Sequence, residues 1–213
     1  MRLRSRVPVV ASSGVSRRAA LSSIVLLPLL AVLAPRQAEA RVIALEGQRF
    51  EDVITLGDRN LRLNGLGLRG VAWVKAFVAG LYVAVPSSEP GALLAQPGPK
   101  RLRLKVMLDA PSHELTKSLV ARINKYEPES ALKQLGERPA RLGALIDSIG
   151  DLHAGDVLDL DFEPAQGVRL LHNERTVGAP VAGDDLYRAV LKIFVGDRPI
   201  DKRMKAGLLR GGY

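Results

Sequence analysis

The chain has 213 residues, no cysteine and three histidines, and its formal net charge is +9. Without cysteine it has no disulfides, no thiolate nucleophile and no cysteine-ligated metal. Aromatic residues make up 4% of the sequence, which leaves few rings for stacking bases and argues against a nucleic-acid-binding protein. None of the histidines has a second ligand at metal spacing, so we expect neither a metal nor a cofactor.

The first forty residues have the layout of a signal peptide. A basic start is followed by an uncharged apolar run over residues 19–34 and then by Ala38-Glu39-Ala40. Small residues at the first and third positions before the cut predict cleavage after Ala40. The apolar run is interrupted by Pro28 and is shorter than the roughly 20 residues that span a bilayer. We therefore expect a periplasmic or secreted protein with no stable membrane anchor.

Two export routes remain open from the sequence. Ser16-Arg17-Arg18-Ala19-Ala20-Leu21 resembles the twin-arginine signal, which carries proteins that fold before export. An ordinary secretory signal that happens to contain paired arginines is the alternative, because the start of any such signal is basic.

Residues 41–213 are expected to form a single domain that begins with strands. Residues 42–85 are rich in Val, Leu and Gly without a helical period, which predicts strands with turns near 57–60 and 64–67. The Pro-rich segment 86–99 predicts a surface connection with one helical turn at 92–95. Residues 101–108 are then expected to form a half-buried strand, because polar and apolar residues alternate from Arg101 to Val106.

The second half of the chain predicts helices on either side of further strands. Ser112 is a candidate N-cap for a helix that ends at Pro128, and Asp184 or Asp185 for an amphipathic helix that ends at Gly196. Other helices are expected at 130–135 and 140–149, separated by Pro139, and at 199–209; strands are expected from 155, at 168–171 and at 175–177, the last two joined at His172-Asn173. This order predicts an α+β domain, an antiparallel sheet with helices on one face.

Charged residues alternate along two of the predicted strands. Arg101, Arg103 and Lys105 point away from the core on one strand, and Asp159 and Asp161 do so on the other. We interpret both sets as solvated strand faces, since the acidic set lacks the spacing of a calcium site.

Two segments resemble the chalcone isomerase family. The first runs from Asn64-Gly65-Leu66-Gly67-Leu68-Arg69-Gly70 to Lys75-Ala76-Phe77-Val78-Ala79-Gly80-Leu81-Tyr82-Val83, similar to the family's Gly-rich segment and the Lys-x-x-x-x-Gly-x-Tyr strand after it. The second is Leu186-Tyr187-Arg188-Ala189-Val190-Leu191-Lys192-Ile193-Phe194-Val195-Gly196, similar to the family's last long helix. The resemblance implies an open-faced β-sandwich with a hydrophobic ligand cleft between the large sheet and its helices.

The resemblance also implies site residues. Plant enzymes of this family cyclise a chalcone with an Arg and several polar side chains; Arg69 matches that Arg, Phe77 and Ile193 stand where the enzymes carry Thr, and Lys117 matches a helix Lys. Losing two cleft hydroxyls removes hydrogen bonds to a developing oxyanion. Lys75, which shares strand parity with Phe77, and Phe194, beside Ile193, complete the expected ligand-binding set.

These residues favour a protein that binds a hydrophobic carboxylate such as a fatty acid without turnover, with Arg69 meeting the carboxylate. If the protein is an enzyme, Arg69 is the candidate catalytic residue of an intramolecular lyase or isomerase acting on an enone-like molecule. Arg69 could instead be a structural residue that bonds backbone carbonyls in a turn. A third hypothesis is a partner-binding scaffold in the cell envelope that uses the basic strand 101–105.

Overall fold

The structure is a computed structural model that describes residues 41–71 and 73–213. The predicted signal peptide, with Arg17, Arg18, Ala38 and Ala40, lies outside the described residues, so cleavage after Ala40 and the export route stay predictions. Within the described part of the chain, no helix is long and apolar enough to cross a membrane.

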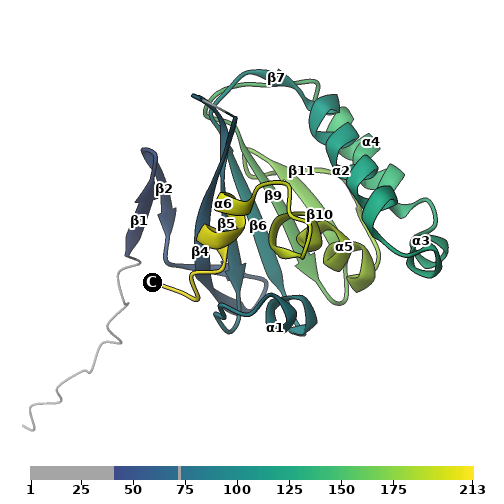
Figure 1. Cartoon of the computed structure of the whole chain (residues 1–213), viewed down its shortest axis with the longest axis horizontal. Helices are drawn as coiled ribbons and strands as arrows, with labels where there is room; N and C mark the ends of the chain where they lie inside the picture. The colour runs from purple at the N-terminus through teal and green to yellow at the C-terminus, as the bar shows by residue number, and fades with distance from the viewer. Residues whose placement is uncertain (1–40, 72) are drawn as a thin grey trace, which may run out of the picture. The chain divides into compact units, whose positions relative to one another are not determined.

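The centre of the fold is a seven-stranded antiparallel sheet (Figure 1). In order across the sheet its strands are β11 (Arg175–Val181), β10 (Gly167–His172), β9 (Val157–Glu163), β6 (Lys100–Val106), β5 (Val74–Val83), β4 (Arg59–Val71) and β3 (Val53–Leu56). Two small two-stranded sheets accompany it, β1 (Val42–Leu45) with β2 (Gln48–Glu51), and β7 (Ala110–Pro111) with β8 (Asp151–Leu152).

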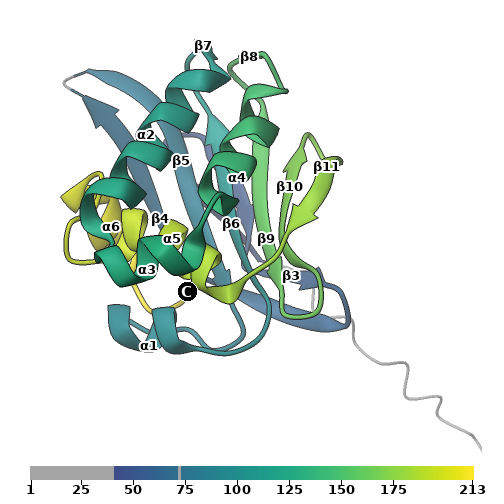
Figure 2. The same cartoon turned by 90° about the vertical axis from the view of Figure 1, so that its right-hand side faces the viewer.

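Helices cover one face of the large sheet (Figures 1 and 2). They are α2 (Ser112–Tyr126), α3 (Glu129–Leu135), α4 (Arg138–Asp147), α5 (Asp184–Val195) and α6 (Lys202–Leu208), with the short α1 (Pro90–Ala95) at one end. The predicted class, an α+β open-faced sandwich with helices on one face of an antiparallel sheet, is confirmed.

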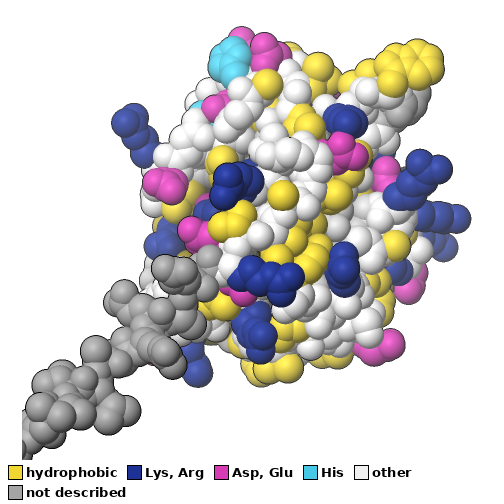
Figure 3. All heavy atoms as spheres, turned by 90° about the vertical axis from the view of Figure 1, so that its left-hand side faces the viewer, with side chains coloured by type: hydrophobic (Ala, Val, Ile, Leu, Met, Phe, Trp, Pro, Cys, Tyr) yellow, Lys and Arg dark blue, Asp and Glu magenta, His cyan; other side chains and the backbone are white. Residues whose placement is uncertain are grey.

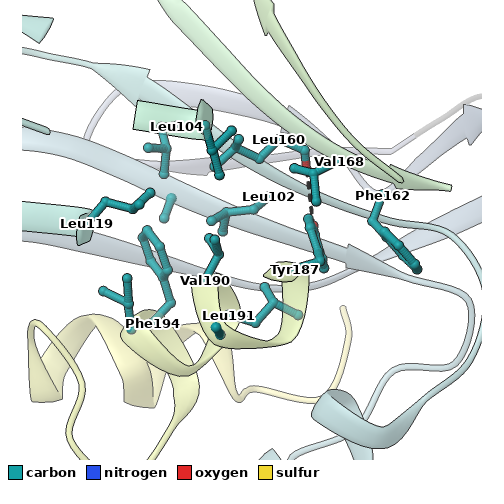
Figure 4. Close-up of a cluster of buried hydrophobic side chains, with 14 of the residues drawn as sticks. Leu102, Leu104, Leu119, Leu160, Phe162, Val168, Tyr187, Val190, Leu191 and Phe194 are labelled. Atoms are coloured by element: carbon teal, nitrogen blue, oxygen red, sulfur yellow. Dashed lines mark hydrogen bonds between the residues drawn. The ribbon is translucent and has the colours of Figure 1, made fainter. Parts of the chain in front are cut away.

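The main core lies between this face and α5. Leu102, Leu104 and Leu160 point from β6 and β9 toward the apolar side of the helix, which carries Val190 and Phe194 (Figure 4). The ring of Tyr187 stacks on Phe162 with centroids 5.3 Å apart, and its hydroxyl donates a hydrogen bond to the Leu160 carbonyl at 3.1 Å. The 3.6-residue period of α5 and the two-residue period of β6 therefore meet as the sequence predicts.

The prediction of a turn at residues 64–67 is wrong, because this glycine-rich stretch lies inside β4. A Cβ on Gly65 or Gly67 would collide with backbone carbonyls of α6, and one on Gly207 would collide with the Leu66 carbonyl. The glycines are thus needed for close approach of a helix to a strand and not for a change of chain direction.

Three predicted boundaries also need correction. Gly183 and Pro111 are the N-cap residues of α5 and α2, and neither helix has a side-chain cap hydrogen bond, so Asp184, Asp185 and Ser112 fall in the first turns instead. Pro139 does not separate two helices but lies in the first turn of α4, where its missing N–H costs nothing. The turn between β10 and β11 is at Asn173-Glu174, both with positive φ.

The prediction of solvated charged faces is wrong for β6 and β9. Asp159 and Asp161 do point away from the helices, but both are buried. Arg103 opposes Asp159 and donates to it from Nε and Nη2 at 2.7 and 2.8 Å, and Arg101 binds Asp161 in the same two-pronged way. Each cation therefore has an anion directly across the strand pair, and the outer face is a ladder of ion pairs.

Candidate functional site

An apolar cleft of about 300 Å³ opens between the sheet and α2. Its walls come from strands β4 to β9, from α2 and from the segments that follow β6 and precede α6. The lining residues are Arg69, Ala76, Phe77, Leu104, Val106, Leu108, Ala110, Pro111, Glu114, Leu115, Ser118, Leu152, Leu158 and Ile200. A narrow extension of about 20 Å³ continues inward and ends at Ile146, Ile193 and Phe194. The interior is almost entirely hydrocarbon, and Ser118 lines both parts.

Strand register places the polar end of the cleft. Arg69 on β4 is paired with Phe77 on β5, which is paired with Val106 on β6. Directly opposed residues in antiparallel strands project to the same face, so all three side chains point to the helix side. Arg69 also continues the row of Gly65 and Gly67, over which α6 lies, and its guanidinium emerges beside the first residues of that helix.

The guanidinium of Arg69 has polar partners at one of its three nitrogens among the described residues. Its Nη1 lies 3.3 Å from Asp201 Oδ2 and 3.5 Å from the Gly70 carbonyl oxygen. Asp201 Oδ1 accepts hydrogen bonds from the backbone N–H groups of Arg203 and Met204, which makes Asp201 the N-cap of α6. Nε and Nη2 of Arg69 have no hydrogen-bond partner among the described residues, and the side chain is 26% exposed.

Four of the six predicted ligand-binding residues are in this site. Arg69 and Phe77 line the main cleft, and Ile193 and Phe194 close its inner extension, where Phe77 also reaches. Arg69 is neither in a turn nor bonded to carbonyls alone, so the structural alternative for it is true only in part.

Lys75 is outside the cleft because a β-bulge changes the strand parity. The register of β4 and β5 shifts between the pairs Arg69–Phe77 and Gly70–Lys75, which leaves Ala76 as the extra residue. Ala76 and Phe77 consequently both line the cleft, and Lys75 turns to the other side, where its Nζ is 2.6 Å from Glu46 Oε2.

Lys117 is also outside the cleft. It lies on the solvent side of α2, and its Nζ donates to Glu114 Oε1 at 2.9 Å. This hydrogen bond lowers the pKa of Glu114, which keeps a carboxylate at the rim of the cleft ionised. The helix instead presents Leu115 and Ser118 to the ligand space.

Sequence reasoning missed Asp201 and Ser118. An Asp followed three residues later by an apolar residue, after a Pro at 199, is an N-cap pattern that would have found Asp201. Its partnership with Arg69, 132 residues away, has no local signal. Ser118 could have been found as the residue one helical turn beyond Glu114 and Leu115 on the same side of α2.

A second hollow, of about 470 Å³, lies on the outer side of α5. It contains Arg122, Tyr126, Lys192 and Arg198, and Lys192 Nζ is 2.8 Å from Glu127 Oε2. Its walls mix apolar residues such as Leu94 and Ile123 with these charged ones, so it suits the apolar body of a ligand less well than the cleft does.

Comparison with known proteins agrees with this architecture. Residues 42–210 match the model of a family described as chalcone isomerase-like. The chain belongs to the chalcone isomerase-like family. A search of curated proteins gives no match. Among solved structures, a fatty-acid binding protein of Arabidopsis thaliana matches with a TM-score of 0.63 and 19% identity, over 80% of this chain and 96% of the plant protein. At that identity the likeness establishes the fold.

The cleft is in the position that the sequence resemblance predicted. It lies between the large sheet and its helices, as the resemblance in the sequence implied, with Arg69 at its polar end and Phe77 and Ile193 in its apolar walls. A single cation at the edge of a hydrocarbon-lined cavity can hold an anionic head group while the cavity takes an apolar tail.

Proposed function

We propose that this chalcone isomerase-like protein binds a hydrophobic carboxylate such as a fatty acid, without chemical turnover. The carboxylate meets Arg69, and the hydrocarbon tail runs along Phe77 and Leu104 toward Ile193 and Phe194. The observation that carries this proposal is an apolar cleft whose edge holds one guanidinium, two nitrogens of which have no hydrogen-bond partner in the described part of the chain. The fatty-acid binding protein of Arabidopsis thaliana that shares the fold supports it.

The free edge of Arg69 suits a carboxylate. Nε and Nη2 lie on the same side of the guanidinium and can donate two parallel hydrogen bonds to the two oxygens of one carboxylate. Nη1 keeps Asp201 meanwhile. The existing ion pair therefore orients the group without being broken, which lowers the entropy that binding would otherwise cost.

The tail supplies affinity and the head supplies selection. Each methylene buried in the cleft is worth about 0.8 kcal/mol, so a long chain gains several kcal/mol. Desolvating a carboxylate in the same cleft is unfavourable unless a charged donor meets it. Affinity should therefore fall when either the chain is shortened or Arg69 is removed.

The lining supports binding over catalysis. Phe77 and Ile193 place hydrocarbon where the resemblance to plant isomerases implies hydroxyls. Stabilising an oxyanion in an apolar cavity requires several donors aimed at it. The cleft offers Ser118 and Arg69 from the described residues, and Glu114 is an ionised acceptor.

The decisive test compares two ligands with the same tail. Isothermal titration with dodecanoate and with dodecanol, for the wild type and Arg69→Ala, should show a loss of about 10- to 100-fold for the acid and little change for the alcohol. Lys125→Ala removes a cation from the far end of the same helix, outside the cleft lining, and serves as the matched control. Equal losses for both ligands, or an unchanged affinity for the acid in Arg69→Ala, would contradict the proposal.

We further propose that the protein acts outside the cytoplasm. The supporting observation is in the sequence alone, the basic, apolar and small-residue order of residues 1–40. Sequencing the N-terminus of the exported protein should give Arg41 as the first residue. Changing Arg17 and Arg18 together to Lys should block export on the twin-arginine route and leave ordinary secretion intact.

A further inference from the structure

The single tryptophan of the chain is at the tip of its longest hairpin. Val71 pairs with Val74, so Trp73 is in the turn between β4 and β5, and it is 91% exposed. An indole ring is among the most costly side chains to leave in water, because it carries a large apolar surface and one N–H. A ring this exposed contributes little buried apolar area to the fold.

The surroundings of this tip are apolar and adjoin the ligand cleft. Val74 and Leu108 are also exposed, and together with Trp73 they are three of the six large hydrophobic side chains that the described residues expose. Leu108 lines the cleft as well, and the Met107 N–H beside it bonds the Ala76 carbonyl at 2.8 Å. The cleft thus opens next to the exposed tip.

The figures place this tip at one end of the molecule. The β4–β5 hairpin ends at the same end as β7, β8 and the start of α2, and α1 is at the opposite end (Figures 1 and 2). In the space-filling view, hydrophobic side chains project where this hairpin ends (Figure 3). The feature is a projecting point and not a flat patch, so it fits insertion into a soft phase better than packing on a second folded surface.

We propose that this tip, made of Trp73, Val74 and Leu108, docks on the surface of a phospholipid bilayer. Tryptophan is concentrated at membrane–water interfaces because its ring suits the acyl boundary while its N–H suits the head groups. Exposed Lys202 and Arg203 stand next to Asp201, the partner of Arg69, and neither is in an ion pair among the described residues. They add attraction for anionic head groups.

Docking in this way would present the cleft to the phase in which fatty acids dissolve. This consequence rests on the proposed function, but the docking does not. A protein that failed to bind fatty acids could still bind vesicles through Trp73, and the two properties are measured separately.

Because the chain has one tryptophan, its fluorescence reports directly on the surroundings of Trp73. Purified protein is mixed with vesicles of phosphatidylcholine and phosphatidylglycerol, without added fatty acid, and its fluorescence is recorded. We expect emission to move to shorter wavelength and to be quenched when the lipids carry bromine on their acyl chains. Unchanged emission, or a shift that rises with protein concentration in the absence of vesicles, would overturn the proposal, the latter in favour of self-association.

Co-sedimentation with the same vesicles tests how much Trp73 contributes to docking. Trp73→Ala should lower the vesicle–water partition coefficient roughly tenfold, as expected from losing a buried aromatic side chain. Val85→Ala is the matched control, because Val85 is 65% exposed and lies just beyond the other end of β5. Dodecanoate affinity in solution should be unchanged in Trp73→Ala and reduced in Arg69→Ala. Equal vesicle binding by wild type and Trp73→Ala would show that the tip does not dock.

Discussion

The two faces of the strand pair β6 and β9 are both shielded from water, one by hydrocarbon side chains and the other by ion pairs. On the helix side, Leu102 and Leu104 meet Leu158 and Leu160 in a hydrocarbon core. On the outer side, Arg101 and Arg103 meet Asp161 and Asp159. The apolar face can contain an unfilled cavity, and the ligand cleft lies there. On the charged face, removing one side chain of an ion pair leaves the other with little solvent and without its counter-ion, which is unfavourable.

The largest expected effect is on the charged face. Asp159→Ala should lower the free energy of unfolding by about 3–5 kcal/mol, because Arg103, whose side chain is only 16% exposed, keeps its charge without a carboxylate partner. Urea denaturation of both proteins measures this.

The control for this prediction removes both charges. Arg103→Leu with Asp159→Leu should be far less destabilising than Asp159→Ala alone, since two apolar residues of suitable volume replace a buried pair at little cost. If the single variant loses less than the double variant, the outer face is solvated in practice and the contrast between the faces fails.

The next effect is on the helix side, where α6 lies directly on β4. Gly67→Ala should cost about 1–3 kcal/mol, because the new Cβ meets the carbonyl and side chain of Met204 and α6 must move away. Gly91→Ala is the control: nothing lies near that position in α1, so alanine should be neutral or slightly stabilising. Thermal unfolding of the two variants distinguishes close packing from a general intolerance of substituted glycines.

The helix side was predictable from sequence to a large extent because hydrophobic period alone determines it. The stripe on α5 and the alternation in residues 101–108 predicted both elements and the faces they bury. Arg69 and Phe77 followed from the family resemblance. The hydrophobic period does not determine strand register. The bulge at Ala76 turns the Lys75 side chain to the opposite face of β5. The glycines of β4 resemble a turn in the sequence, and only their contact with α6 explains them.

The outer side was not predictable for a different reason. A strand with charged residues at every second position has the same sequence pattern whether water or an opposite charge lies beside those residues. Only the pairing of Arg101 with Asp161 across β6 and β9 makes the difference, and these residues are 60 apart in the chain. Pairing also removes the basis for the partner-binding hypothesis, since the basic strand 101–105 is occupied by its own acids and, at Lys105, by the Arg49 carbonyl.

A smaller effect tests a buried polar contact on the apolar face, between Tyr187 and the Leu160 carbonyl. Tyr187→Phe should cost about 1 kcal/mol, because the Leu160 carbonyl loses a hydrogen bond in a buried position while ring stacking on Phe162 is kept. Tyr126→Phe, at an exposed ring, should change the free energy of unfolding by less than half as much. Equal effects would mean that the buried hydroxyl contributes nothing specific.

The smallest effect comes from an ion pair at the rim of the helical layer, between Arg138 on α4 and Asp185 on α5, 2.6 Å apart. The hydrogen bond from Arg138 lowers the pKa of Asp185. A carboxyl with a lowered pKa in the folded state stabilises the protein above its unfolded pKa, near 3.9, and loses that contribution as the pH falls through the folded value. Asp185→Asn should therefore be less stable than the wild type by up to about 1 kcal/mol at neutral pH, with the gap closing below about pH 4.

The residues are the same types as in the outer ladder, but both are about a quarter exposed, so solvent screens them. Urea titrations of both proteins across this range decide the point. A loss as large as that of Asp159→Ala would show that burial is not what makes the ladder strong.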